Sequence, residues 1–342
     1  HLAAGAEHLY VFQRTPSSID VRANRPTDPE WAAGLQPGWQ QHRMDNFNTL
    51  VSGGLADEDL VADGWTDIIG NLLMRIRRDN PSDVEAMAQA MELADFEKME
   101  QIRARVDALV GDADTAEALK PYYRQFCKRP CFHDEYLQSF NRDNVTLVDT
   151  SGQGVERLTE RGVVANGHEY EIDCLVYATG FEVGTAYSRR AGCETYGRHG
   201  LTLTDKWADG ASTLHGIHTH GFPNLFIFSL VQSGFSVNFP HMLAEQAHHV
   251  AYILDHARRH DIELIEADAE AEAAWVQTIM DVAMYNQQFF EECTPGYYNN
   301  EGHPSDRSVR NGSYGAGPVE FAKLLDRWRR EGELEGLQLT RR

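Results

Sequence analysis

The sequence lacks several features that would place it in common classes of protein. No apolar stretch approaches the ~20 residues that a membrane-spanning helix requires. Basic residues are few, since 31 Lys+Arg stand against 52 Asp+Glu, and the formal net charge of −21 argues against nucleic acid or an anionic membrane as a partner. The 342 residues are 42% hydrophobic, which is enough for two domains with cores of their own. These features predict a soluble, cytoplasmic protein.

Cysteine is scarce as well, and its spacing indicates no metal site. The five cysteines form neither a CxxC pair nor a zinc pattern, and an odd number in a long chain favours reduced thiols over a disulfide framework. The fifteen histidines include His218 with His220 and His248 with His249, yet no acid or cysteine stands at a ligand-like offset. We therefore expect histidines scattered over the surface and pockets, and no bound metal.

The opening residues have neither an initiator Met nor a basic leader followed by an apolar run, so neither a natural start nor a signal peptide is expected. An Ala-rich opening predicts the end of a helix, and Leu9–Phe12 predicts a strand. Pro16 then ends a polar tip because it disfavours a helical Thr15. Helix, strand and polar tip form part of a βαβ unit. The sequence is expected to open partway through a nucleotide-binding domain.

Residues 21–120 differ in character from both flanks. Prolines interrupt the first part, after which the apolar period becomes helical. Ser82 and Glu85 have the spacing of a capping box, and one helical face follows it, made of Met99, Ile102, Val106 and Leu109. The segment reads as a helical insertion. A methionine-rich binding surface is the alternative to core packing, and core packing is favoured.

The second half of the chain predicts a mixture of strands and helices. Asn166-Gly167 is a strong hairpin signal. Short strands are expected at Val145–Val148, Val155–Leu158, Val163–Val164 and Ile172–Tyr177, with longer apolar ones at Asp173–Phe181 and Gly221–Ser229. Helices are expected over 241–260, onward to about 290, and over 318–330.

Four stretches, in this order, resemble segments of the Baeyer–Villiger monooxygenases, flavoproteins that insert oxygen beside a ketone: YVFQRTP, CKRP, YATGF and GFPNLFIF. Further segments are similar to the family: FNRDNVTLVD, LTDKWADG, CTPGYYNNEG and SYGAGPVEF. The form CTPGYYNNEG resembles the branch that acts on large cyclic ketones and steroids. One departure is clear, because no GxGxxG motif occurs. The resemblance therefore implies a chain without the family's N-terminal third, which carries its glycine-rich loops and the FxGxxxHxxxWP fingerprint.

The resemblance implies an α/β fold with two dinucleotide-binding (Rossmann-like) domains, both incomplete here. Residues 1–20 and 121–165 would form part of the NADPH-binding domain, and residues 21–120 the helical insertion. Residues 166–342 would form the C-terminal part of the FAD-binding domain with a C-terminal extension.

Coenzyme choice is expected to depend on the tip Gln13-Arg14-Thr15. The second strand of a dinucleotide-binding domain ends near the adenosine ribose, where an acid favours NAD and a cation accommodates the 2′-phosphate of NADP. The tip carries Arg14 and no carboxylate. Lys128 corresponds to the family's other phosphate contact, and no acid stands between Pro121 and Phe132, a stretch that also holds Arg124 and Arg129. NADPH is favoured, and a solvated arginine after a strand is the alternative.

Arg129 is the residue that the resemblance marks as catalytic. In the family, NADPH reduces FAD, the reduced flavin adds O2, and the resulting flavin peroxide attacks a ketone as an anion to give an ester or a lactone. A guanidinium stabilises that negative charge without giving up its proton. It would also stabilise the anionic adduct, as an oxyanion hole does. An ordinary ion pair of Arg129 with Asp134 or Glu135 is the alternative.

The remaining site residues follow from the resemblance. Thr179 and Gly180 would lie near the linkers between the nucleotide domains, and Gln232, Asn238 and Met242 would border the isoalloxazine of FAD. Phe235 and Phe239 could line the ketone pocket. Tyr297 and Tyr298 are candidates for its outer wall, with ordinary core aromatics as an equal alternative.

Two other functions stay open. A related flavin enzyme that oxidises nitrogen or sulfur atoms, or a disulfide-reductase relative, would share some of these motifs, although CKRP and the helical insertion argue against it. A catalytically inactive fragment or binding scaffold is the third possibility. The partners implied by the first reading are a ketone and O2, and the sequence does not indicate an oligomeric state.

Overall fold

The chain divides into two compact units in a computed structural model that describes residues 1–80, 82–180, 186–283, 287–303 and 307–341, with only the backbone for a few of them, Tyr297 included. Unit 1 comprises His1–Pro37, Ala62–Phe181 and Gly296–Tyr298. Unit 2 comprises Gly38–Val61, Glu182–Pro295 and Asn299–Arg342. The boundaries predicted from the sequence remain a prediction about cofactor-binding domains.

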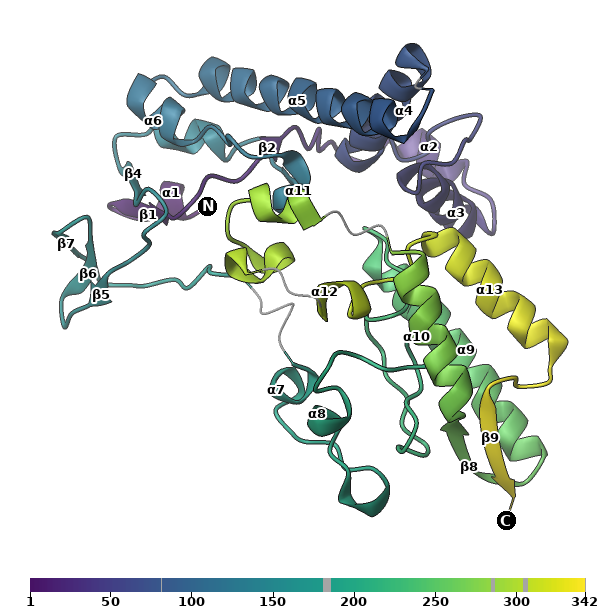
Figure 1. The fold of residues 1–342 in the computed structure, drawn as a ribbon. Coiled ribbons are helices and arrows are strands. Elements are labelled where there is room, and N and C mark those ends of the chain that lie inside the picture. The colour runs from purple at the N-terminus through teal and green to yellow at the C-terminus, as the bar shows by residue number, and fades with distance from the viewer. Residues whose placement is uncertain (81, 181–185, 284–286, 304–306, 342) are drawn as a thin grey trace. The chain divides into compact units, whose positions relative to one another are not determined.

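Unit 1 combines short parallel strand pairs, a small antiparallel sheet and a pair of long helices (Figure 1). Its helices are α1 (Leu2–Gly5), α2 (Pro29–Ala33), α4 (Gly64–Asp79), α5 (Val84–Leu109) and α6 (Ala113–Ala118), with 3-10 turns η1 (Gln125–Cys127) and η2 (Leu137–Asn141). Its strands are β1 (Leu9–Gln13), β2 (Ile19–Asp20), β3 (Cys131–Phe132), β4 (Val145–Asp149), β5 (Arg157–Leu158), β6 (Gly162–Ala165) and β7 (His168–Glu171).

Two parallel strand pairs position the N-terminal part of the candidate site. β1 pairs with β4, so that Leu9 lies opposite Val145 and Gln13 opposite Asp149. β2 pairs in the same sense with β3. The strands predicted at Leu9–Phe12 and Val145–Val148 are thereby confirmed. Beneath them lies a core cluster built from α1, β2, α5, α6, η2 and β4: Ala3, Ile19, Val106, Val110, Ala116, Leu119, Leu137, Phe140 and Val145.

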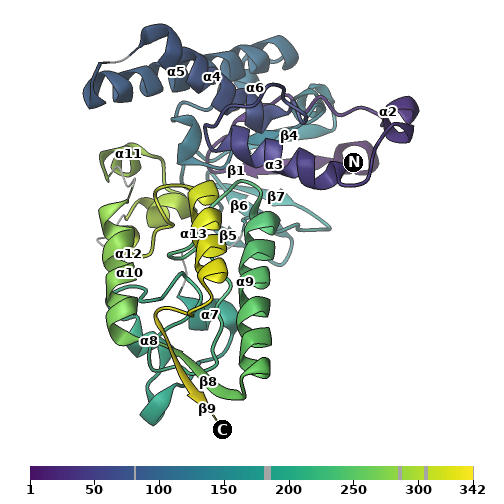
Figure 2. The same cartoon turned by 90° about the vertical axis from the view of Figure 1, so that its right-hand side faces the viewer.

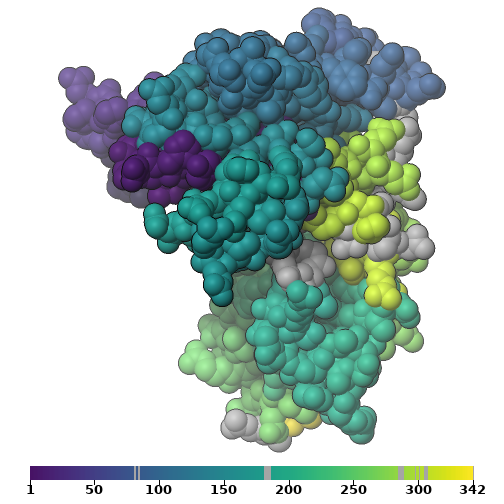
Figure 3. All heavy atoms as spheres, turned by 90° about the vertical axis from the view of Figure 1, so that its left-hand side faces the viewer, coloured from purple at the N-terminus to yellow at the C-terminus, as the bar shows by residue number. Residues whose placement is uncertain are grey.

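The hairpin predicted from Asn166-Gly167 is confirmed. The φ angles of Asn166 and Gly167 are 52° and 72°, as a two-residue turn with both residues in the left-handed region requires, and the turn joins the antiparallel strands β6 and β7. The strand predicted at Ile172–Tyr177 is wrong, because the second arm of the hairpin is β7 and ends at Glu171. Figure 3 shows the N-terminal residues, in purple, beside this part of unit 1.

Helix α5 packs into a core, as predicted, but its N-cap is not the predicted residue. The side chains of Met99, Ile102 and Val106 are each 1% exposed, so this face is core and not a methionine-rich binding surface. The N-cap is Asp83, whose side chain accepts from the Ala86 N–H, and not Ser82. A carboxylate at this position also interacts favourably with the helix dipole.

Unit 2 is mainly helical, with one antiparallel strand pair. Its helices are α3 (Trp39–Val51), α7 (Tyr187–Ala191), α8 (Leu203–Lys206), α9 (Phe239–Arg259), α10 (Ala269–Asp281), α11 (Gln287–Glu292), α12 (Arg307–Arg310) and α13 (Pro318–Glu331), with the 3-10 turns η3 (Arg198–Gly200) and η4 (Tyr297–Gly302), which begins in unit 1. Its strands are β8 (Ile262–Ala267) and β9 (Leu337–Arg341).

Helices α9, α10 and α13 lie side by side and close over a shared core (Figure 2). Each supplies buried apolar side chains, among them Met242, Trp275, Ile279, Phe321 and Leu325. The helices predicted over 241–260 and 318–330 are confirmed as α9 and α13. A helix running onward to residue 290 is wrong, because β8 occupies the start of that segment and pairs with β9.

The two long apolar strands predicted from the sequence are not strands. Residues 173–180 have no regular secondary structure and are exposed, and Phe181 lies outside the described residues. Residues 221–229 form turns and irregular chain with isolated backbone bonds, such as the one from the Ile227 N–H to the Ile217 carbonyl. An apolar run becomes a strand only beside a partner strand, and none of the described strands pairs with either segment.

The fold class is α/β, as predicted. Cys131, Cys174 and Cys193 are free thiols, whereas Cys127 and Cys293 are each disulfide-bonded, so the expectation of reduced thiols is wrong for those two. In the part of the chain that the structure describes, no helix is both long enough and apolar enough to cross a membrane.

Candidate functional site

In the tip Gln13-Arg14-Thr15, which begins at the last residue of β1, Arg14 is exposed and Gln13 is buried. Gln13 is 8% exposed, and its amide donates to the carbonyl of Ala118 at 2.9 Å. The Gln13 carbonyl accepts from both the N–H and the hydroxyl of Thr150, at 2.9 and 2.7 Å. Arg14 is exposed and Thr15 is half-buried. The backbone of the tip is therefore fixed, and its side chains at the surface are those of Arg14 and Thr15.

Tyr123 connects Lys128 to the segment after β1. Its hydroxyl donates to the carbonyl of Pro16 at 2.8 Å, and the Lys128 Nζ lies 5.9 Å from the centre of its ring. Burial raises the pKa of Tyr123 well above its usual value, so the hydroxyl keeps its proton and remains a donor. Lys128 therefore contacts the tyrosine that holds the chain two residues beyond Arg14.

The positive charge of the stretch between Pro121 and Phe132 is partly neutralised by acids from another part of the fold. Arg124 lies 3.0 Å from Asp95 and 3.5 Å from Glu92, both on α5. The acids come from the helical insertion and so were invisible in the local sequence. Arg129 remains as a cation of this stretch for which no carboxylate partner is seen within the described residues of unit 1.

Arg129 is exposed and contacts an aromatic ring. Its guanidinium carbon lies 5.2 Å from the centre of the Trp65 ring, near the start of α4. The alternative ion pair with Asp134 or Glu135 does not form among the described residues. Asp134 instead accepts from three backbone N–H groups, those of residues 22, 23 and 24, and these bonds lower the pKa of its carboxyl. Arg129 thus keeps its full charge at the surface.

The chain on either side of Arg129 is fixed by polar contacts. Arg105 of α5 donates to the carbonyls of Ile19 and His133, both at 3.0 Å. Lys98, which is 8% exposed, joins Asp20 on β2 to Asp67 on α4 at 2.5 and 2.7 Å. These bonds hold β2, β3, α4 and α5 together around the arginine.

A cavity of about 330 Å³ lies between α4 and α5 but contains no residue singled out from the sequence. It is lined by Asn71, Met74, Arg75, Arg78, Ala94, Glu97, Lys98 and Gln101. Its arginines are paired, since Arg75 bonds to Asp79 and Glu97. This lining favours a helix–helix contact over a ligand site.

The segment 232–242 divides into buried and exposed residues. Gln232 is fully buried, and its amide accepts from the N–H and hydroxyl of Thr213 and donates to the carbonyls of Ala211 and Arg310. Met242 is fully buried in the core of unit 2. Neither side chain is at the surface of the unit. Contact of these two residues with a flavin stays a prediction.

The aromatic residues of the same segment point outward. Phe235 is 40% exposed and Phe239 is 37% exposed, while Asn238 is half-buried at the start of α9. Gly234 allows this arrangement because a Cβ there would lie 2.4 Å from the Met242 side chain. The loop thus packs closely on the core and presents its two phenylalanines.

The other predicted contacts are less well placed. Thr179 and Gly180 lie in the exposed, irregular segment, where Gly180 has a φ of 90°. Tyr298 is half-buried, and the side chain of Tyr297 lies outside the described residues. Their roles stay predictions.

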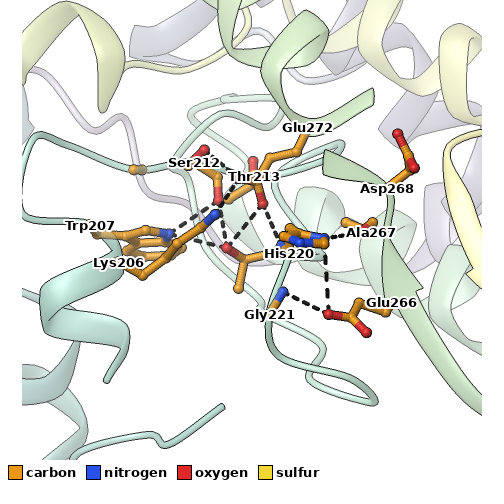
Figure 4. A network of polar contacts seen from close by, with 12 residues as sticks. Lys206, Trp207, Ser212, Thr213, His220, Gly221, Glu266, Ala267, Asp268 and Glu272 are labelled. Atoms are coloured by element: carbon orange, nitrogen blue, oxygen red, sulfur yellow. Dashed lines mark hydrogen bonds and ion pairs between the residues drawn. The ribbon is translucent and has the colours of Figure 1, made fainter. Parts of the chain in front are cut away.

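Sequence reasoning missed two buried carboxylates that organise unit 2 (Figure 4). Glu272, which is 4% exposed, accepts from Ser212 at 2.6 Å, from Lys206 at 2.7 Å and from the N–H of His220. Glu266, which is 5% exposed, accepts from the Arg198 side chain and the Gly221 N–H, both at 2.8 Å. Their charges fasten the irregular chain 198–221 to β8 and α10. In the sequence, the only signal of their burial is that Glu266 lies within a strand and Glu272 within a helix.

Three histidines lie in the core of unit 2 and not at its surface, which corrects the expectation for His218 and His249. His215, His218 and His249 are at most 8% exposed, and burial lowers their pKa values to about 4, 3 and 2. The rings of His215 and His249 pack against Trp275 and Trp328, with centroids 5.0 and 4.7 Å apart. Among the described residues, no group of three or more acids, cysteines and histidines could hold a metal ion.

Curated relatives match nearly the whole chain. The neopentalenolactone D synthase of Streptomyces avermitilis is 56% identical over 342 residues, which are 99% of this chain and 58% of that protein. The Baeyer–Villiger monooxygenase of Stachybotrys chlorohalonatus is 48% identical over 341 residues, which are 99% of this chain and 55% of that protein. The chain thus spans somewhat more than half the length of these relatives. No protein-family model matches the sequence.

Solved structures have the same fold. The polycyclic ketone monooxygenase of Thermothelomyces thermophila aligns with a TM-score of 0.87 at 37% identity, over 99% of this chain and 57% of that chain. The cyclohexanone monooxygenase of Rhodococcus sp. Phi1, bound to NADP+, aligns with a TM-score of 0.74 at 25% identity, over 100% of this chain and 64% of that chain.

Proposed function

We propose that this chain, which is homologous along nearly its whole length to Baeyer–Villiger monooxygenases, forms part of a flavin-dependent monooxygenase. Such an enzyme would use NADPH and O2 to convert a ketone to an ester or a lactone. The observation that carries this proposal is the state of Arg129, which is exposed, charged and without a carboxylate partner among the described residues.

The cofactors of the proposed enzyme are FAD and NADP. The nicotinamide would supply a hydride, and the flavin would supply the oxygenating chemistry. The chain has a donor set that fits the extra phosphate of NADP, because Arg14 directly follows β1 and Lys128 contacts the tyrosine that binds the next segment. No carboxylate of the tip opposes a phosphate there. FAD is supported by homology, since a relative 41% identical to the chain is named as an FAD-binding monooxygenase.

Arg129 would act on the ketone oxygen. Negative charge develops on that oxygen when the carbonyl carbon is attacked, and a guanidinium stabilises it while remaining protonated at any working pH. A fixed cation at such a position acts as an oxyanion hole does. Lys could not replace it fully, because an ammonium can lose its proton and lacks the planar fork of donors.

A bulky ketone is the substrate that the relatives favour. One structural neighbour is named as a polycyclic ketone monooxygenase and another as a steroid monooxygenase. Phe235 and Phe239 would provide the apolar contact that such a substrate needs. A cytoplasmic location belongs to the same proposal and is supported by the strongly acidic composition.

The test uses the FAD- and NADPH-loaded enzyme that contains this chain. It is incubated with a polycyclic ketone under 18O2, and the product is analysed by mass spectrometry. We expect one labelled oxygen atom in the ester or lactone and NADPH consumption in proportion. A thioether and a tertiary amine are assayed in parallel. Oxidation of these with no ester formation would favour the nitrogen- or sulfur-oxidising alternative, and the absence of any oxygenation would favour a binding scaffold.

A further inference from the structure

Trp65 lies against the guanidinium of Arg129 at 5.2 Å, although 64 residues separate them in the chain. We propose that Trp65 is a positioning residue, which orients Arg129 through its ring without neutralising the charge. The inference rests on the proposed function, because it gives Trp65 a role that acts through Arg129.

The first turn of α4 fixes the position of Trp65. Asp63 caps the helix, and its carboxylate accepts from the N–H of Trp65 at 2.9 Å and from that of Thr66 at 3.3 Å. In return, the Thr66 hydroxyl accepts from the Asp63 N–H at 3.1 Å. This reciprocal cap satisfies the N–H groups that a helix start leaves unpaired, so Trp65 stands on a well-defined turn.

Phe132 holds the tryptophan ring from the segment that carries Arg129. The two rings meet edge to face with centroids 5.5 Å apart, an arrangement that aromatic pairs favour. Gly64 makes this approach possible, because a Cβ at residue 64 would lie 2.1 Å from the Phe132 ring. Arg129 and Phe132, which both contact Trp65, are thus three residues apart on one short stretch of chain.

An ionic anchor adds a third restraint on the same turn. Lys98 bonds to Asp67, two residues after Trp65, and to Asp20 on β2, the strand that pairs with β3. The Lys98 and Asp20 side chains are only 9% and 14% exposed, so that ion pair is poorly screened by solvent, whereas Asp67 is 52% exposed and its pair is screened more. The start of α4 is therefore tied to β2, which pairs with β3, the strand that follows Arg129.

An aromatic ring suits a catalytic cation better than a carboxylate does. The nearby Arg124 has two carboxylate partners, and these cancel much of its field. A ring attracts a guanidinium through its quadrupole but adds no opposing charge, and it leaves the in-plane N–H donors available to a substrate oxygen. The contact with Trp65 therefore restricts the side chain of Arg129 while preserving what catalysis requires.

The first test compares Trp65→Leu with Trp65→Phe in the loaded enzyme. An exposed or partly desolvated cation–π contact is worth a factor of roughly 2 to 30. We expect Trp65→Leu to lower the turnover rate of ester formation by about that factor and to leave the KM for NADPH within about twofold. Trp65→Phe should recover most of the rate. The matched control is Tyr122→Leu, because the Tyr122 ring lies at a similar 5.3 Å from Arg103.

A second measurement does not depend on activity. Phenylglyoxal modifies accessible guanidinium groups, and peptide mass spectrometry gives the modification rate of each arginine in the purified chain. We expect Trp65→Leu to raise the rate at Arg129 several-fold, Trp65→Phe to leave it unchanged, and Tyr122→Leu to affect Arg103 only. Equal labelling and equal turnover in Trp65→Leu and the unmodified protein would overturn the proposal.

A double substitution separates this proposal from the function it rests on. If Trp65 acts through Arg129, then Trp65→Leu should cause no further loss in an Arg129→Ala background, where no cation is left for the ring to orient. An equal loss in both backgrounds would make Trp65 an independent structural residue and overturn the positioning role. If Arg129→Ala keeps near-native ester formation, the proposed role of Arg129 itself is wrong, whatever the labelling shows.

Discussion

The charged groups described in the two units differ in their exposure to solvent and in their pairing. Arg129 is exposed and contacts a ring, whereas Glu272 is 4% exposed and accepts from three different residues at normal or short distances. An incompletely paired charge at the surface is available to a ligand. A buried charge must be fully paired, because removing it from water is costly. An exposed charge can therefore take part in binding or catalysis, whereas a buried and paired charge stabilises the fold.

The histidines of unit 2 extend the contrast. His215 and His249 avoid burying a charge by staying neutral among tryptophan rings. Substitutions in the first region should therefore change turnover or coenzyme binding with little effect on unfolding. Substitutions in the second should do the reverse.

The largest effect is expected for Arg129→Ala in the loaded enzyme. Ester formation should fall by at least ~10²–10³, because one preorganised donor to a developing oxyanion is lost. Arg129→Lys should recover little of it. Product analysis gives the rate, and urea unfolding should change little because Arg129 is exposed. A clear loss of stability with normal turnover per folded enzyme would reverse the contrast.

Glu272→Ala should produce the opposite pattern. Removing this carboxylate leaves the Lys206 ammonium and the Ser212 hydroxyl without their acceptor, and breaking a buried pair costs about 3–5 kcal/mol. The midpoint of urea unfolding should fall accordingly, while the folded enzyme keeps its turnover. Glu320→Ala is the control, because its ion pair with Lys323 is exposed and should contribute less than about 1 kcal/mol.

The pair Arg14→Ala and Lys128→Ala should weaken NADPH binding far more than NADH binding. Two charge-assisted contacts are together worth roughly 3 kcal/mol, or about a hundredfold in the dissociation constant. Titration of the enzyme with each coenzyme measures the difference, with Lys323→Ala as a control cation. Equal weakening with both coenzymes would mean that the 2′-phosphate is bound by other residues.

The last prediction concerns pH and unit 2, where each single histidine contributes a small effect. In the folded protein, the pKa values of His215, His218 and His249 lie below the usual 6.5. The stability that these neutral histidines contribute is therefore fully present above pH 6.5 and is lost as the pH falls. Below that value the unfolded chain binds protons that the folded chain excludes. Each histidine should then lower the free energy of unfolding by up to about 1.4 kcal/mol per pH unit.

Urea unfolding at pH 7, 6 and 5 measures that slope. His215→Phe preserves the aromatic packing against Trp275 and should reduce the slope between pH 6 and 5 by about one proton. An unchanged slope would mean that His215 is protonated in the folded protein.

The sequence predicts best where the signal is local. β1, β4 and the hairpin at Asn166-Gly167 were legible because β-forming residues and turn residues stand next to each other. The described runs 173–180 and 221–229 have a similar β-forming composition and form no strand, since pairing depends on a partner elsewhere. β8 and β9 were missed for a related reason, because they pair across about 70 residues.

The candidate site shows the same limit. Short motifs predict Arg14, Lys128 and Arg129 as site residues, and the structure relates Lys128 to the segment after β1 through Tyr123. Trp65 could not be found, because no motif joins it to Arg129. The burial of Gln232 and Met242 could not be predicted, because a loop sequence does not reveal which of its side chains face the core.

The pairing of β1 with β4 has a consequence for the order of synthesis. Gln13 and its partner Asp149 are 136 residues apart, and no other described strand lies beside β1. A ribosome adds about 5–20 residues per second, so the apolar strand waits on the order of ten seconds before its described partner exists. During that interval its unpaired edge can join a neighbouring nascent chain. Expression at a lower temperature, or with more chaperone, should therefore raise the soluble yield.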